Sequence, residues 1–186
     1  PLQLAKGSHE PGSDRGCAMN VVSYVNGDVE ITDYPRCSAR PLARIVQSVN
    51  DVLADQVTGL LSPENALIAL NLGFRTMGTR VAQFRQQAEW WRQLTGNDTS
   101  EWRWMDGNST EVWGYMFREF CKETTETITS SEGTKHTYVV SSEWDAKGLV
   151  EWASKAIDMW REMIPPTDSP VTEAQISDVA DRLVSA

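Results

Sequence analysis

The stretch from Ser142 to Met163 constrains the fold more than any other part of this 186-residue chain. Ser142 and Asp145 stand where the cap of a helix is expected, and Pro165-Pro166 closes the segment at its other end. Between these signals, apolar side chains recur every three or four residues, at Leu149, Trp152, Ala153, Ala156, Ile157, Trp160 and Met163. Such a stripe forms one face of a helix and has to be buried against other elements.

Weaker versions of this pattern occur along the whole chain. They predict further helices near residues 16–26, 40–53, 62–73, 75–94 and 109–128, and a last one after Ser169-Pro170. Residues 136–140 have the composition of a strand, and the best available partner is 125–131. We therefore predict a mainly α fold: a single-core bundle of about seven helices with, optionally, a small β-hairpin near residues 125–141.

The net charge of −9 is distributed unevenly. Residues 1–96 contain nine Lys/Arg and nine Asp/Glu, whereas residues 97–186 contain eight Lys/Arg and seventeen Asp/Glu. We divide the chain into a charge-neutral helical part with the Cys and His residues (1–96) and an acidic, Trp-rich helical part (97–186), within one compact domain. The acidic half argues against nucleic-acid binding and is compatible with a basic protein partner, or with a merely solvated surface.

The cysteine count and the hydropathy bear on the compartment. Three cysteines are too few, and an odd number, for a disulfide framework, which is typical of a reducing environment. No apolar run approaches the roughly 18 residues that span a membrane, and the first residues do not have the pattern of a signal peptide. We expect a cytoplasmic protein that does not act at a membrane.

Cys17 is the strongest candidate for chemistry. It falls in the first turn of a predicted helix, where the helix dipole lowers the pKa of a thiol. His9 in the preceding segment and Asp33 in a later turn would complete a Cys–His–Asp catalytic set. The competing interpretation is that Cys17 is a small buried residue and that Asp33 and Asn50 only cross-link a loop to a helix.

The same residues allow a zinc site as a weaker alternative. His9, Cys17, Cys37 and Asp33 have the right ligand types. Their spacing does not match a zinc finger or ribbon, because no two cysteines lie two to four residues apart. No cofactor is otherwise indicated, since the chain lacks the usual phosphate-binding and hydrolase motifs.

Tryptophans provide candidates for a binding surface. Trp102 and Trp104 lie in the most irregular stretch of the chain, and Trp90 is followed directly by Trp91 on a predicted helix. Two adjacent residues on a helix cannot both point to the same core, so we expect at least one of this pair at an edge. Trp102, Trp104 and Trp90 are therefore the predicted anchors for a protein partner.

The first third of the chain resembles a family of small actinobacterial and actinobacteriophage proteins. In that family a Gly-x-His step is followed by a Gly-x-Cys-x-Met helix, an (S/T)-Asp-x-Pro turn and a helix that ends in Asn-Asp. The matching residues are Gly7, His9, Cys17, Met19, Thr32, Asp33, Pro35, Asn50 and Asp51. The family often has His where this chain has Tyr34, a difference that weakens a role for that position as a base or metal ligand. The resemblance implies an accessory or phage host-interaction role.

These observations favour a binding or interaction protein without an assignable catalytic activity. A Cys–His enzyme that uses Cys17 and a structural subunit of a larger assembly are the two alternatives. The oligomeric state is left open by the sequence.

Overall fold

The computed structural model of the chain describes residues 3–7, 15–80, 84–98, 109–166, 174 and 177–178. Across these residues it contains six helices and four strands. The helices are α1 (Ala18–Val25), α2 (Arg40–Leu53), α3 (Pro63–Arg75), α4 (Phe84–Thr95), α5 (Ser109–Phe120) and α6 (Ala146–Met163). The strands are β1 (Gln3–Leu4), β2 (Arg15–Gly16), β3 (Cys121–Thr129) and β4 (Lys135–Trp144).

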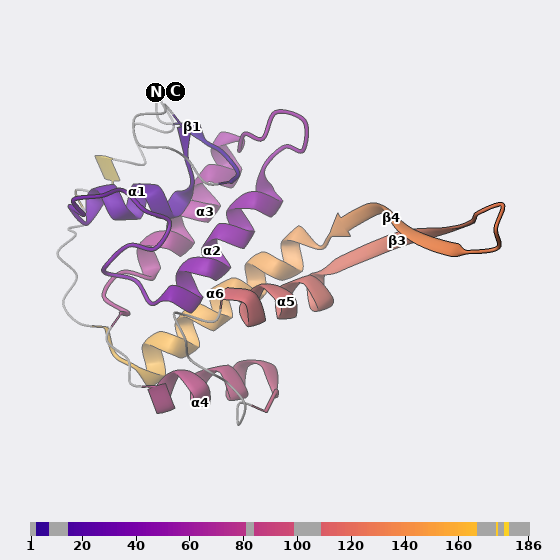
Figure 1. Cartoon of the computed structure of the whole chain (residues 1–186). Helices are drawn as coiled ribbons and strands as arrows, with labels where there is room; N and C mark the ends of the chain where they lie inside the picture. The colour runs from indigo at the N-terminus through magenta and orange to yellow at the C-terminus, as the bar shows by residue number, and fades with distance from the viewer. Residues whose placement is uncertain are drawn as a thin grey trace.

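Helix α2 lies at the centre of the helical body. It contacts α1, α3, α5 and α6. Helix α4 packs against α6, at the opposite end of the helical body from α1 (Figure 1). The buried side of α2 is continuous, from Leu42 and Ile45 to Val46 and Val49, each of which is fully buried. A helix that is covered on several sides needs this width of apolar surface.

Local signals in the sequence explain where several helices begin. Ser62 caps α3, where its hydroxyl accepts a hydrogen bond from the Asn65 N–H at 3.2 Å, and Pro63 follows. Asp145 caps α6 in the same way, accepting from the Gly148 N–H at 2.9 Å. After α1, Gly27 adopts a φ of 75°, a left-handed conformation that terminates helices and that glycine tolerates best.

The buried residues form one cluster that contains residues from both halves of the sequence. It extends from Leu4 in β1 to Ile164 after α6, with Trp90, Trp91 and Trp160 as its largest fully buried side chains. Two-residue strands β1 and β2 pair in parallel and bring the start of the chain against the start of α1. None of the described helices has the length and apolar character needed to cross a membrane.

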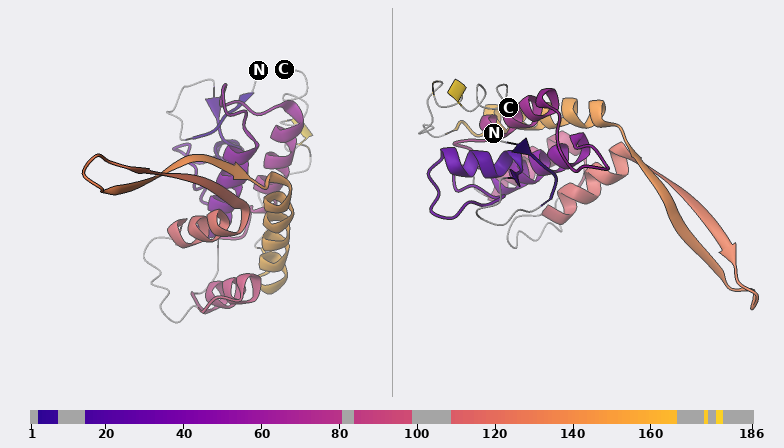
Figure 2. Two further views of the ribbon diagram at one scale, coloured as in Figure 1. Left: turned by 90° about the vertical axis from the view of Figure 1, so that its right-hand side faces the viewer. Right: turned by 90° about the horizontal axis from the view of Figure 1, so that it is seen from above.

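A long hairpin, β3–β4, leaves this body. Its strands pair antiparallel from Cys121 opposite Trp144 to Thr129 opposite Lys135, and it projects away from the helices in Figure 1 and in the right-hand view of Figure 2. We call it the arm. At its base, the Asp145 N–H donates to the Phe120 carbonyl at 2.8 Å, where α5 ends and α6 begins. Nine residues of β3 correspond to a length of about 30 Å.

The predicted mainly α bundle of about seven helices is wrong. The described residues form a mixed α/β structure, with six helices, 53% helix and two small sheets. The main error concerns residues 121–128, which were assigned to the helix beginning at Ser109 but belong to β3. Threonine is concentrated there, and its branched Cβ favours a strand over a helix. The expected hairpin near 125–141 is part of this longer one, and the helix predicted after Ser169-Pro170 lies largely outside the described residues.

Candidate functional site

Cys17 and Asp33 lie in contact. Cys17 occupies the N-cap position of α1, and its Sγ donates to the Asp33 Oδ1 at 3.4 Å. The Asn20 side-chain amide donates to the same oxygen at 2.9 Å. Cys17 is only 1% exposed, so the thiol is enclosed between α1 and the loop that carries Asp33.

This environment raises the pKa of the Cys17 thiol to about 12. Burial is the largest cause, and the negative charge of Asp33 is the next, because both disfavour a thiolate. Backbone N–H groups of Asn20 and Met19 at the helix start act in the opposite direction, but less strongly. The expected lowering of the pKa by the helix is therefore wrong in its direction. A buried thiol that donates to a carboxylate has little nucleophilic character at neutral pH.

Asn50 and Asp51 connect the same region to the N-terminal strand. The fully buried Asn50 amide accepts from the Ala18 N–H at 3.1 Å and donates to the Ala5 carbonyl at 2.9 Å. The Asp51 carboxylate accepts from the Gly7 N–H at 3.0 Å. These bonds hold β1, α1 and α2 together, whereas the Asp33 loop is joined to α2 by Gln47, whose side-chain amide donates to the Asp33 carbonyl at 2.7 Å.

Cys37 is the second cysteine among the predicted site residues. Cys37 is partly buried, and its Sγ lies 3.7 Å from the Ser38 hydroxyl; burial is the main cause that raises the pKa of its thiol. His9 lies outside the described residues. Across the described ranges, no three His, Cys, Asp or Glu side chains are grouped to hold a metal ion, so Cys17, Asp33 and Cys37 do not form such a group.

The prediction that Trp90 anchors a partner needs correction, because its ring is completely buried. Its indole N–H donates to the Ala156 carbonyl at 2.9 Å, and its ring meets that of Trp160 edge-on at 4.9 Å. Trp91 is buried as well, against Tyr115 at 5.4 Å. Both neighbours are covered because α6 lies on one side of α4 and α5 on another. The other two predicted anchors, Trp102 and Trp104, lie outside the described residues.

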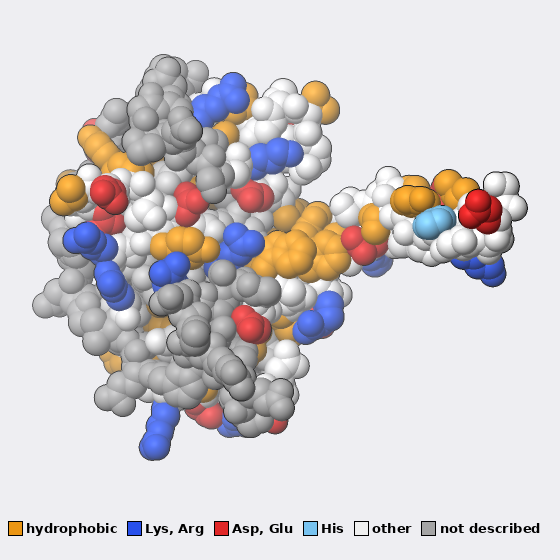
Figure 3. Space-filling model, viewed as in Figure 1, with side chains coloured by type: hydrophobic (Ala, Val, Ile, Leu, Met, Phe, Trp, Pro, Cys, Tyr) orange, Lys and Arg blue, Asp and Glu red, His pale blue; other side chains and the backbone are white. Residues whose placement is uncertain are grey.

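The arm is a functional candidate that the sequence analysis did not identify, since it predicted only a small hairpin near residues 125–141 and gave it no role. Every residue from Lys122 to Thr129 and from Lys135 to Glu143 is exposed. Its large apolar side chains are more than half exposed: Ile128 (59%), Tyr138 (52%), Val139 (54%) and Val140 (51%). Figure 3 shows hydrophobic side chains along the arm and at its base. The signal for it was the threonine-rich alternation on both sides of Glu132-Gly133.

The two faces of the arm differ in chemistry. Ile128 pairs with His136, and the ring of His136 lies 6.2 Å from that of Tyr138, so these side chains share one face. On the other face, the hydroxyls of Thr127 and Thr137 are 3.0 Å apart. Because Thr124 pairs with Ser141 and Thr125 with Val139, β4 contains one extra residue, a β-bulge at Val140.

Aromatic rings line the surface where the arm joins the body. Phe117 stacks on Trp113, with ring centroids 5.0 Å apart, and meets Trp144 edge-on at 5.7 Å. Trp113 is 39% exposed. This aromatic base therefore presents apolar surface next to the arm, on the face shown in Figure 3.

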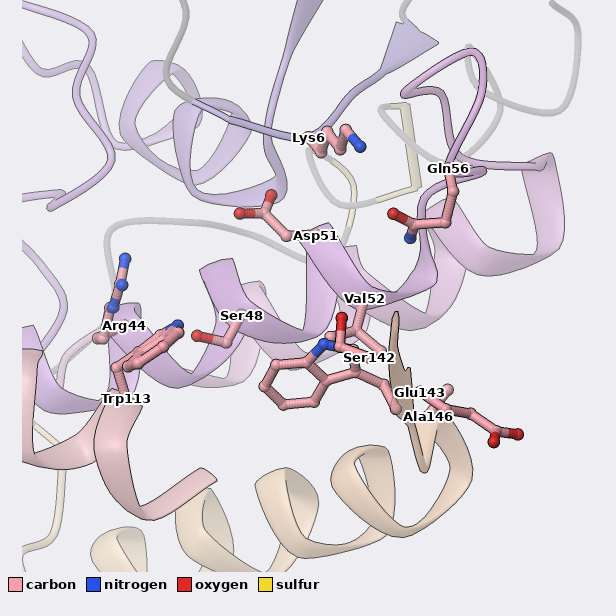
Figure 4. A pocket seen from close by; sticks show the side chains of 11 residues that line it. Lys6, Arg44, Ser48, Asp51, Val52, Gln56, Trp113, Ser142, Glu143 and Ala146 are labelled. Atoms are coloured by element: carbon pink, nitrogen blue, oxygen red, sulfur yellow. The ribbon is translucent and has the colours of Figure 1, made fainter. Parts of the chain in front are cut away.

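A cavity of about 480 Å³ opens beside this aromatic base (Figure 4). Trp113 and residues of α2, including Ser48 and Val52, form part of its wall, with Lys6 and Gln56 on the far side. Among the described residues, the buried Ser48 hydroxyl and the Nε of Arg44 have no hydrogen-bond partner. The cavity has space for a side chain of a bound protein, and its lining charges balance, with Lys6 and Arg44 against Asp51 and Glu143.

Comparisons with models of protein families, with curated proteins and with solved structures gave no match to this chain.

Proposed function

We propose that this chain is a binding and interaction protein, with the arm as its principal contact element. The observation that carries the proposal is a two-stranded sheet, β3 and β4, that leaves both faces and both outer edges uncovered by the described residues. A hairpin with two strands alone is marginally stable in water, whereas a third strand or a covering surface stabilises it. Large apolar side chains exposed on such an element are typical of a surface that another protein covers.

The partner is a protein rather than a nucleic acid or a membrane. The arm carries Lys122 and Lys135 against four glutamates, at positions 123, 126, 132 and 143, and so lacks the basic surface that nucleic acids and anionic lipids require. The acidic excess of residues 97–186 favours a partner with a basic surface during encounter. The aromatic base and the cavity beside it supply room for an anchoring side chain.

A cytoplasmic setting and an accessory or host-interaction role complete the proposal. All three cysteines are free, which agrees with a reducing compartment. The role in a phage or its host rests on the resemblance of the first third of the chain. Catalysis by Cys17 is not part of the proposal, since its thiol is buried and its pKa is raised to about 12.

Site-specific photo-crosslinking in the native cells tests the proposal. A benzophenone amino acid replaces Tyr138 on the arm or, as a control, Val29, which is 90% exposed in the loop after α1. We expect a discrete protein adduct from position 138 and none from position 29, with the attached chain identified by mass spectrometry. Equal labelling at both positions, or no adduct at either, contradicts the proposal.

A further inference from the structure

We infer that the free edge of β3 pairs with β3 of a second copy of this chain, antiparallel and about a twofold axis at Thr124. The inference rests on the proposed function, because it names the occupant of one edge of the arm; the basic partner of the proposed function binds the rest of the arm and its aromatic base. Two arms joined in this way form a four-stranded sheet from two marginal hairpins. The pairing is self-complementary, as a twofold interface between identical subunits has to be.

The two outer edges of the arm differ in how readily they can pair with a further strand. Strand β4 carries the β-bulge at Val140, a feature that hinders pairing with a further strand. Strand β3 contributes no extra residue to the ladder over its nine positions, from Cys121 to Thr129. Its outer backbone groups have no neighbouring strand within the described structure. The edge that is open to pairing is therefore that of β3.

The charges of β3 decide the register in which two copies of this strand can pair. An axis at Thr124 places Lys122 opposite Glu126 of the second copy, and the symmetry repeats this contact. An axis at Glu123 or Glu126 would place identical carboxylates opposite each other. An axis at Thr125 would place Lys122 opposite Ile128 and so gain no charge contact.

The charged groups of Lys122 and Glu126 are available for contact with a second copy. Lys122 and Glu126 are exposed, and neither takes part in a salt bridge with another described residue. They lie an even number of positions from Thr124, so all three side chains emerge on one face of the strand. Residues opposite each other in an antiparallel pair are close enough for direct contact between side chains.

A charge-swap series tests the occupant and the register together. The mass of the 20.8 kDa chain is followed by sedimentation as a function of concentration. We expect a dimer for the wild type, and dimers weakened roughly tenfold by Lys122→Glu or Glu126→Lys, since each change creates two like-charge contacts. The double variant restores opposite charges and should recover the wild-type affinity. Lys135→Glu makes the same charge change on β4 and should leave the dimer unaffected.

Disulfide formation tests the position of the twofold axis independently of the charge-swap series. In a Cys121→Ser background, Thr124→Cys should oxidise to a covalent dimer, because residues facing each other across an antiparallel pair meet the distance requirement of a disulfide. Thr127→Cys on the same strand faces position 121 of the second copy and should stay monomeric on a non-reducing gel. All substituted side chains on the arm are exposed, apart from the partly exposed Cys121, so the body should fold in every variant.

The outcomes separate this inference from the proposed function. A wild-type monomer at high concentration overturns the inference, and so does a dimer that is indifferent to both charge reversals. If the chain is monomeric but position 138 still crosslinks to a different protein, the proposed function stands and only the dimer is ruled out. If the wild type is a monomer and position 138 gives no protein adduct, both the inference and the proposed function are contradicted.

Discussion

At the scale of single residues, Cys17 shows how burial and a neighbouring charge outweigh the helix dipole. Its pKa is raised from 9.0 to about 12, so the folded state prefers the neutral thiol. The stabilisation is fully present below about pH 9 and is lost as the pH rises toward 12. We expect the free energy of unfolding to fall more between pH 7 and pH 10 for the wild type than for Cys17→Ser, which keeps a donor for Asp33 and does not titrate there.

Urea unfolding at the two pH values measures this difference. Cys37, Cys121 and Tyr115 also have raised pKa values and are present in both proteins, so the comparison isolates Cys17. Parallel losses in the two proteins would show that the Cys17 thiol does not contribute to the alkaline transition.

Asn50 carries a second prediction at this scale. Its buried amide satisfies the Ala18 N–H and the Ala5 carbonyl, so Asn50→Ala leaves both groups buried without these partners. The expected loss in the free energy of unfolding is about 1–3 kcal/mol. Asn97→Ala, at an exposed position after α4, is the matched control and should change stability by less than about 0.5 kcal/mol. A similar effect of the two substitutions would contradict the structural role of Asn50.

At the scale of secondary-structure elements, a boundary could be predicted from the sequence only where neighbouring residues mark it. The start of α6 follows directly from Asp145 and the apolar stripe that succeeds it, because a cap and a period are properties of neighbouring residues. The change from α5 to β3 at Cys121 has no stop signal of its own, since neither Gly nor Pro marks it. Only the threonines beyond Cys121 disfavour a continuation of α5, so the sequence predicts a hairpin that is shorter than the arm.

The candidate site, too, could be predicted from the sequence only in part. Cys17 and Asp33 were chosen together from their residue types, and they do lie in contact, but the sequence carries no information on how deeply they are buried. The burial of both Trp90 and Trp91 depends on α5 and α6, which follow much later in the chain. A periodicity analysis assigns each helix one buried face, whereas a helix placed against two neighbours buries two.

At the scale of the whole molecule, the arm and the body are separable by their contacts. The body is held by the shared core around α2, to which β3 and β4 contribute only near their base, through Trp144 and the bond between Asp145 and Phe120. Residues beyond Thr124 and Ser141 are exposed on both strands. The stability of the body should therefore be independent of most of the arm.

A shortened arm tests this separation. Replacing residues 125–140 by Asn-Gly joins the paired residues Thr124 and Ser141 through a two-residue turn suited to a hairpin. Because few core contacts are lost, we expect the melting temperature to stay within about 4 °C of the wild type, the shift that 1 kcal/mol produces in a chain of this size. The same variant should sediment as a monomer, since most of the proposed β3 interface is gone. A large drop in melting temperature in both dilute and concentrated solution would show that the arm stabilises the body of its own chain. A drop that appears only at concentrations where the wild type is dimeric is the result expected from mass action, because association stabilises the folded state only when it occurs.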